Sequence, residues 1–150
     1  MKMYTDYMGN LGKLEGVDLD FASGKIANTL HAHRVLQYLQ DNKSPDAAIA
    51  ALSSLYEQYF TQGQHPSAAT TLTSACRAAG LSESEAKALV EDESEGLMEA
   101  RMAVREQAGN GVDSVPYVVF EGRKRDFTLI GAKEVGEYEK VLAQVARECS

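Results

Sequence analysis

Two β-rich runs near the C-terminal end are the strongest constraint on the fold of this 150-residue chain. Residues 117–121 and 127–130 are rich in Val, Ile, Phe, Tyr and Thr, and a polar segment containing glycine joins them. Such a pair of runs predicts an antiparallel hairpin. A two-stranded sheet is marginal by itself and leaves an open edge, so the hairpin needs cover from elsewhere.

The rest of the chain has the spacing of amphipathic helices. Apolar side chains recur at helical intervals, most clearly from Ile49 to Phe60. Cap residues predict helices that begin at Asn28-Thr29, at Ser44-Pro45 and at Ser82. Apolar spacing and end signals predict further helices from about Ser67 to Ala79, from the acidic run Glu91–Glu95 to about Ala108, and from Val135 to Val145. We therefore predict five helices, one hairpin and one further helix, which is an α+β chain.

Composition and charge exclude several classes of partner. A formal net charge of -7 disfavours binding to nucleic acid or to an anionic membrane surface. No apolar run approaches the length of a membrane span, and the first residues lack the apolar core of a signal peptide. We therefore expect a cytoplasmic protein without nucleic-acid or membrane partners.

Val115 and Pro116 stand directly before the first β-rich run. Because proline lacks an N–H, it is tolerated as the first residue of a strand, and a cis Val115–Pro116 bond is the alternative reading. This loop, the hairpin and the last helix resemble the C-terminal half of a thioredoxin-like domain. More narrowly they resemble the DsbA-like family that includes FrnE-type proteins and 2-hydroxychromene-2-carboxylate isomerases. Residues 111–116 match its G-V-x-x-V-P loop, in which the proline is cis and faces the active-site helix.

The resemblance extends through the helical middle. Residues 28–34 are similar to the N-T-x-x-A-H-R segment of the family, and it covers nearly the whole chain from about Leu14. The family's fold begins with a strand, a helix carrying the reactive cysteine or serine, and a second strand, for which nothing before Leu14 has the pattern. We therefore expect residues 1–150 to form one incomplete thioredoxin-like domain without its N-terminal redox-motif half. Its helical part would span about 14–108 and its strand–hairpin–helix part about 111–148.

The resemblance implies thiol–disulfide oxidoreductase chemistry, or a glutathione-dependent isomerisation as in the nearest relatives. In a completed fold the loop would offer main-chain groups to an extended thiol or disulfide substrate or to glutathione. The substrate-binding residues expected from the resemblance are Val115, Pro116, Asn28, His33 and Arg34. For His33 and Arg34 there is a second reading, in which one caps the core and the other forms a surface ion pair.

The cysteines do not supply the chemistry that the family implies. Thiol exchange needs a thiolate made acidic by its surroundings and a second thiol to resolve the mixed disulfide. Cys76 and Cys149 form no C-x-x-C motif; we expect the first to be a buried apolar residue and the second to be exposed near the end of the chain. We therefore expect no catalytic residue and little redox activity in this chain.

Two further expectations follow from the residues. His31 and His33 are two positions apart on a helix and point to nearly opposite faces, so we expect no metal site. The strand edge at Tyr117–Glu121 would be unpaired, which favours a homodimer through that edge. A non-catalytic helical interaction module is the alternative function.

Overall fold

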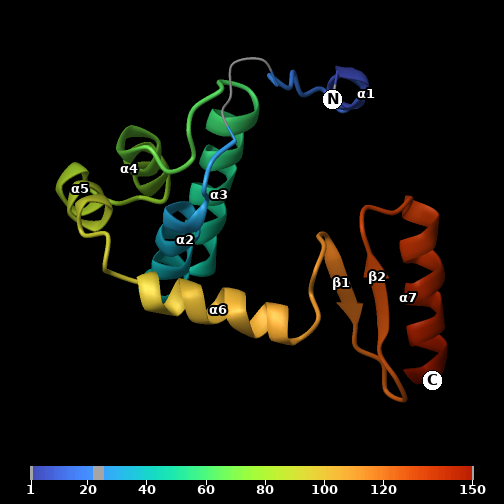
Figure 1. Ribbon diagram of the computed structural model, residues 1–150. Coiled ribbons are helices and arrows are strands. Elements are labelled where there is room, and N and C mark those ends of the chain that lie inside the picture. The colour runs from blue at the N-terminus through green and yellow to red at the C-terminus, as the bar shows by residue number, and fades with distance from the viewer. Residues whose placement is uncertain (1, 22–25, 150) are drawn as a thin grey trace. The chain divides into compact units, whose positions relative to one another are not determined.

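The computed structural model describes residues 2–21 and 26–149, which contain seven helices and a two-stranded sheet (Figure 1). The elements are α1 (Lys2–Leu14), α2 (Leu30–Asn42), α3 (Pro45–Phe60), α4 (Ala69–Ala78), α5 (Glu83–Glu91), α6 (Leu97–Gly109), β1 (Tyr117–Phe120), β2 (Phe127–Ile130) and α7 (Val135–Cys149). The chain divides into two compact parts: a helical unit, residues 1–103, and a hairpin unit, residues 104–150. The predicted α+β class is confirmed.

The core of the helical unit lies among α2, α3, α4 and α5. Helix α3 packs against α2 and α4, and α5 packs against α4 (Figure 1). The face of α3 that packs is formed by Ala48, Ala51 and Leu55, whereas Ile49 and Tyr56 are 60% and 56% exposed. The packed face therefore differs from the predicted stripe of α3, of which only Leu55 is fully buried.

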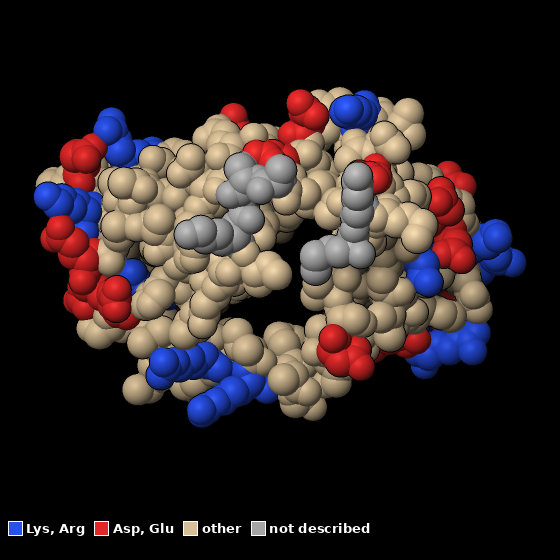
Figure 2. All heavy atoms as spheres, turned by 45° about the horizontal axis from the view of Figure 1, so that its top comes forward, with Lys and Arg blue, Asp and Glu red and all other residues tan. Residues whose placement is uncertain are grey.

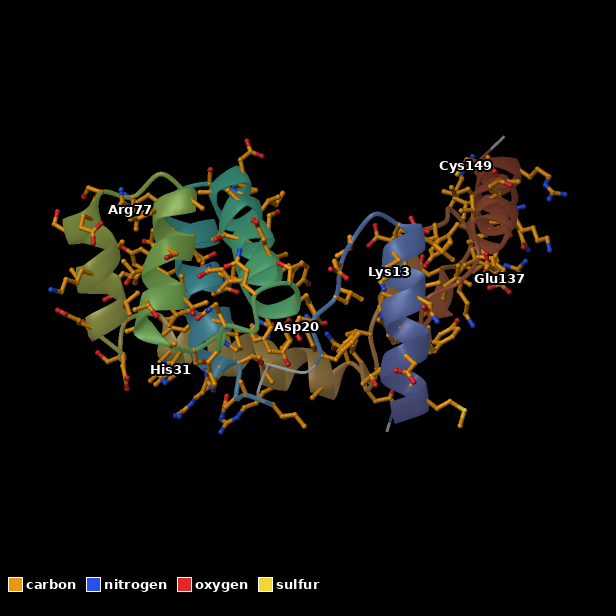
Figure 3. The ribbon with its side chains drawn as sticks, turned by 90° about the horizontal axis from the view of Figure 1, so that it is seen from above. Lys13, Asp20, His31, Arg77, Glu137 and Cys149 are labelled. Atoms are coloured by element: carbon orange, nitrogen blue, oxygen red, sulfur yellow. The ribbon has the colours of Figure 1, made fainter. Side chains whose placement is uncertain are left out.

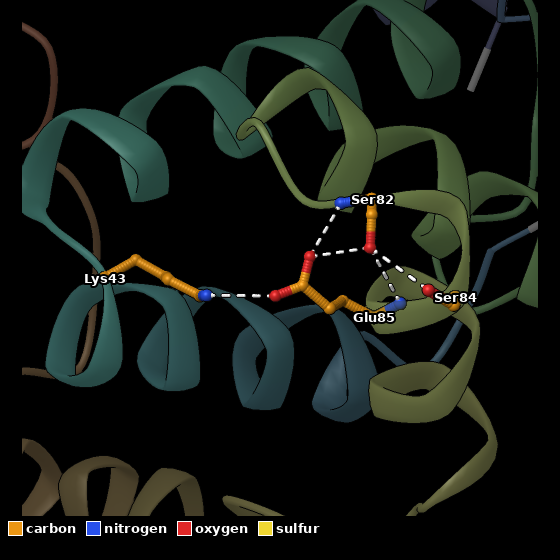
Figure 4. Close-up of polar contacts among 4 residues, drawn as sticks. All are labelled: Lys43, Ser82, Ser84 and Glu85. Carbon is orange, nitrogen blue, oxygen red and sulfur yellow. Dashed lines mark hydrogen bonds and ion pairs between the residues drawn. The ribbon is translucent and has the colours of Figure 1, made fainter.

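Side-chain caps fix two of the helix starts, as the sequence predicts. The Ser44 hydroxyl accepts a hydrogen bond from the amide of Ala47, with Pro45 at the first helical position of α3. At α5, the Ser82 hydroxyl accepts from the amide of Glu85, and the Glu85 carboxylate accepts from the amide of Ser82 (Figure 4). The hydrogen bonds from Ser82 and the nearby Lys43 ammonium lower the pKa of Glu85 to about 2.

Two segments differ from the prediction. Helix α1 was not expected; Gly9 and Gly12 lower the helix propensity of this segment and obscure the helical spacing of its apolar residues. The acidic run Glu91–Glu95 does not begin a helix as predicted, because α5 continues to Glu91 and α6 begins only at Leu97. The residues between them form a turn rather than the start of a helix.

The hairpin unit is built from one tight hairpin and α7. Tyr117 lies opposite Ile130 and Phe120 opposite Phe127 in the antiparallel register. One face of the sheet contacts α7, where the rings of Phe120 and Tyr138 are 6.3 Å apart. None of the described α7 residues is fully buried, so this layer is thin.

Gly122 permits the tight turn between β1 and β2. A Cβ atom added at Gly122 would lie 2.2 Å from the main-chain oxygen of Arg125. The amide of Gly122 also donates to the Asp126 carboxylate over 3.2 Å. On the other side of the turn, Arg125 pairs with Glu148 of α7 at 3.1 Å and lies over the Phe127 ring. The turn is therefore stabilised by the Gly122–Asp126 hydrogen bond within it and by the Arg125–Glu148 ion pair with α7.

Candidate functional site

The loop that leads from α6 into β1 begins with a glycine-dependent helix end. Gly111 has a φ of +81°, a conformation that L side chains rarely adopt. The amide of Gly111 donates to the carbonyl of Ala108, and that of Val112 donates to the carbonyl of Gln107. These two bonds form a Schellman motif, which turns the chain out of the helix and starts the loop at a fixed position.

At the end of this loop the Val115–Pro116 peptide bond is cis, in agreement with the loop resemblance. The Pro116 carbonyl accepts a hydrogen bond from the amide of Gly131 over 2.8 Å. This bond extends the β1–β2 pairing by one residue and ties the loop to the hairpin. Val115 is 81% exposed, so its side chain and the adjacent main chain are accessible in the hairpin unit.

The pairing of Pro116 with Gly131 also determines which main-chain groups of β1 point outward. In an antiparallel pair, successive residues of one strand alternate between bonding to the partner and pointing away from it. Because Pro116 bonds toward β2, the N–H and C=O groups of Tyr117 and Val119 are directed to the opposite edge. Within the described ranges the sheet contains β1 and β2 alone, so this outer edge of β1 has no neighbouring strand.

The remaining predicted binding residues lie around the start of α2 in the helical unit. The Asn28 side-chain oxygen accepts from the amide of Leu30, and its carbonyl accepts from the hydroxyl of Ser67. Asn28 therefore caps the start of α2 and ties it to the turn before α4. His33, one turn further along, is exposed and lines a pocket between α2 and α3.

Arg34 is fully buried and serves as a clamp within the helical unit. Its guanidinium Nη1 donates to the carbonyls of Leu89, Asp92 and Glu95, each over 2.9 Å. These carbonyls belong to the end of α5 and the turn before α6, which explains why that turn is ordered. Burial lowers the pKa of Arg34, and the negative charge of Asp92 opposes this shift. Arg34 therefore caps the core, as one of the two readings left open by the sequence has it, whereas the substrate-binding role predicted for the exposed His33 stays a prediction.

The two cysteines lie in different surroundings. Cys76 is completely buried in the core of the helical unit, and burial raises the pKa of its thiol to about 11 despite the nearby Arg34. Such a thiol is protonated near neutral pH and inaccessible to a substrate. Cys149 is exposed at the end of α7, in the hairpin unit (Figure 3). Both placements agree with the expectation from the sequence.

Neither the charges on the face seen in Figure 2 nor the potential metal ligands among the described residues indicate a further site. On the face seen in Figure 2, Lys and Arg side chains are mixed with Asp and Glu rather than gathered by sign. No group of three or more His, Cys, Asp and Glu side chains in the described residues is arranged to hold a metal ion. None of the described helices is both long and apolar enough to cross a membrane.

The structure thus places the candidate residues in two groups. Val115 and Pro116 adjoin the open edge of β1 in the hairpin unit, while Asn28, His33 and Arg34 belong to the helical unit. The sequence did not predict the pocket beside His33, because its aromatic residues Tyr56 and Phe60 were assigned to a buried stripe. Their position close to the Gly63–Pro66 turn, where α3 ends, was the signal that could have suggested partial exposure.

Solved structures share this fold. A "probable DsbA oxidoreductase" from Streptomyces coelicolor is 23% identical, with a TM-score of 0.79 over 95% of this chain. A "putative protein disulfide isomerase" from Nitrosomonas europaea is 12% identical, with a TM-score of 0.73 over 99% of this chain and 74% of its own. This chain spans 59% of the length of the Streptomyces protein. No curated protein matches the chain in sequence at a significant level.

A family model provides the assignment that structural similarity at such low identity does not. The model of the DSBA-like thioredoxin domain matches residues 1–143, which is nearly the whole sequence. The match includes both the helical unit and the hairpin unit, up to the last turns of α7. The chain therefore belongs to the DSBA-like thioredoxin domain family.

Proposed function

We propose that this chain is the substrate-holding part of a DsbA-like thiol–disulfide oxidoreductase, close to FrnE-type proteins. In such a reaction a thiolate of the enzyme attacks one sulfur of a disulfide, forms a mixed disulfide and releases the other sulfur as a thiolate. A second thiolate of the enzyme then attacks the mixed disulfide, forms a disulfide with the first cysteine and releases the remaining substrate thiolate. The family membership and the names of the two similar structures support this class of chemistry. The proposal assigns to these 150 residues the binding of substrate and assigns the cysteine pair to a segment outside them.

The state of the two cysteines supports this division. The Cys76 thiol is buried and has a raised pKa, and Cys149 lies in the other compact unit. Neither thiol is therefore both acidic and placed beside a resolving partner. The Streptomyces protein is longer than this chain, which spans 59% of it. We expect little redox activity from the chain alone.

The observation that carries the proposal is the open backbone edge beside Pro116. Val115 is exposed, and the N–H and C=O groups of Tyr117 and Val119 are directed away from β2. An extended peptide, or the peptide portion of glutathione, binds such groups through main-chain hydrogen bonds that require no particular side chain. Binding through the main chain suits an enzyme whose disulfide substrates differ in amino-acid sequence. In the completed protein the family's first strand would cover Tyr117 and Val119, so that the main chain at the exposed Val115 would remain to bind the substrate.

His33 is the second proposed contact with substrate. It is exposed at the start of α2, on the wall of a pocket between α2 and α3. Asn28 contributes by capping α2 and so fixing the turn of helix that carries His33. Arg34 fixes α5 and the following turn from inside the core and makes no surface for a ligand.

Amide chemical shifts test this proposal directly. Isotope-labelled chain is titrated with glutathione and with a short peptide whose cysteine is replaced by serine, so that no covalent bond forms. We expect the amides of Val115, Tyr117 and Val119 to shift, while those of Cys76 and its neighbours in the core stay unchanged. Shifts confined to α4 and α5 would contradict the assignment of the binding edge.

A further inference from the structure

A pocket of about 230 Å³ opens between α2 and α3 at the end of the helical hairpin where α2 begins and α3 ends. Because α2 and α3 pack directly against each other, both walls of the pocket belong to one compact unit. The residues that matter for its chemistry are Thr29, His33, Leu36, Tyr56, Tyr59 and Phe60. No role in thiol exchange is needed to account for this pocket.

The walls of the pocket are largely aromatic and are ordered by ring contacts. The Phe60 ring meets Tyr59 at 4.9 Å and Tyr56 at 5.7 Å between centroids, each in an edge-to-face arrangement. Phe60 and Tyr56 are nevertheless 37% and 56% exposed, so the array ends at an open ring. A further aromatic ring can extend such an array with favourable edge-to-face or offset contacts.

The size of the pocket selects a small guest. Apolar cavities of about 150 Å³ with leucine, isoleucine and phenylalanine walls hold one benzene molecule, and drug-sized ligands need about 300–1,000 Å³. A volume of about 230 Å³ therefore fits a single ring with one or two small substituents.

The polar groups of the pocket select the substituent. Of the residues that line it, Thr29, Tyr56 and Tyr59 carry hydroxyl groups and His33 carries an imidazole, and none of the described lining residues is Asp, Glu, Lys or Arg. A ligand with several charges, such as a nucleotide, would find no Asp, Glu, Lys or Arg side chain with which to pair. A neutral ring with one hydroxyl group satisfies both the apolar walls and the imidazole.

We propose that this pocket binds a free monocyclic phenol, with the ring against Tyr56 and Phe60 and the hydroxyl hydrogen-bonded to His33. The inference goes beyond the proposed oxidoreductase function and shares only His33 with it, because the pocket contains neither cysteine and no part of the hairpin unit. A failure of phenol binding would therefore leave the binding of thiol or disulfide substrates at Val115 and β1 untouched, and the reverse also holds.

Titration of the full 150-residue chain with p-cresol tests the proposal, with binding followed by calorimetry and by chemical shifts of Tyr56 and Tyr59. A ligand of this size should bind with a Kd of about 0.1–1 mM. Toluene lacks the hydroxyl and should bind about fivefold more weakly, the loss expected for one hydrogen bond. N-acetyltyrosinamide carries the same phenol with a main chain that exceeds the pocket, and should bind at least about tenfold more weakly.

Two surface variants with matched controls locate the site. His33→Leu should weaken p-cresol to the affinity of toluene and leave toluene unchanged, whereas His65→Leu, in a turn outside the pocket, should alter neither. Tyr56→Ala should weaken both ligands about fivefold or more, whereas Tyr7→Ala on α1 should have no effect. The proposal is overturned if p-cresol shows no saturable binding up to about 10 mM. It is equally overturned if His33→Leu and Tyr56→Ala leave binding intact, or if N-acetyltyrosinamide binds as tightly as p-cresol.

Discussion

The guanidinium of Arg34 on α2 donates a hydrogen bond to the carbonyl of Leu89, 55 positions along the chain, over 2.9 Å. The same nitrogen reaches the carbonyls of Asp92 and Glu95, so one side chain satisfies main-chain acceptors at the end of α5 and in the following turn. A helix leaves its last carbonyls unpaired, and in this fold a buried arginine takes the place of a glycine cap. The positive charge of Arg34 is thus stabilised in the core by hydrogen bonds to main-chain carbonyls rather than by an ion pair.

Replacing Arg34 should therefore destabilise the helical unit strongly. Arg34→Met should lower the free energy of unfolding by about 3 kcal/mol or more, because each unpaired buried carbonyl costs about 1–3 kcal/mol. The free energy of unfolding of Arg34→Lys should lie between those of the wild type and Arg34→Met, since an ammonium group lacks the planar fork of donors. Urea unfolding measures both. Arg77→Met is the control: Arg77 of α4 (Figure 3) is exposed and pairs with Glu83 of α5, and its loss should cost less than about 1 kcal/mol. Equal effects at the two arginines would contradict the clamp.

Two glycines of the hairpin unit should respond oppositely to alanine. Gly122→Ala should destabilise this unit by about 1–3 kcal/mol, because the new Cβ would meet the carbonyl of Arg125 at 2.2 Å. Gly136→Ala lies in α7 with nothing within 4 Å and should stabilise by about 0.5–1 kcal/mol through helix propensity. Thermal unfolding of the two variants should shift Tm in opposite directions. A Tm raised by both substitutions would show that the hairpin turn is looser than described.

The capping box predicts a particular dependence on pH. Folding lowers the pKa of Glu85 from its ordinary value of 4.5 to about 2, mainly through the hydrogen bonds from Ser82. A carboxylate with a depressed pKa contributes stability that is complete above 4.5 and is lost as the pH falls toward 2. The wild type should therefore exceed Glu85→Gln in stability at pH 7, with the difference shrinking between pH 4.5 and pH 2. Glu83→Gln, which does not cap, is the matched control. A stability difference between the wild type and Glu85→Gln that grows on acidification would contradict this prediction.

The open edge of β1 should support association of two chains. The amide of Val119 is directed away from β2, whereas that of Val118 is directed toward it, so proline should act differently at the two positions. Val119→Pro should preserve the hairpin and abolish the dimer that we expect at micromolar concentration, while Val118→Pro should disrupt the hairpin itself. Sedimentation velocity and circular dichroism measure the two effects. A wild type that sediments as a monomer throughout would rule out this dimer.

Local signals predicted most of the fold and little of the site. The caps at Ser44 and Ser82 and the hairpin runs act within a few residues, so the sequence alone located them. Helix α1 was missed because two glycines mask its spacing, and the burial of Arg34 was left open because its acceptors lie 55 or more residues away. The pocket beside His33 depends on which side of α3 packs, and alanines rather than aromatic residues determine that.

The most direct test of the proposed function is the turnover of a model dithiol and of its disulfide by the purified 150-residue chain. The proposed function assigns substrate binding to this chain and the reactive cysteine pair to a segment outside it. It therefore predicts a rate equal to that of the Cys76→Ser/Cys149→Ser double variant and of a protein-free control. Turnover above both controls, lost when either cysteine alone is changed to serine, would contradict this account.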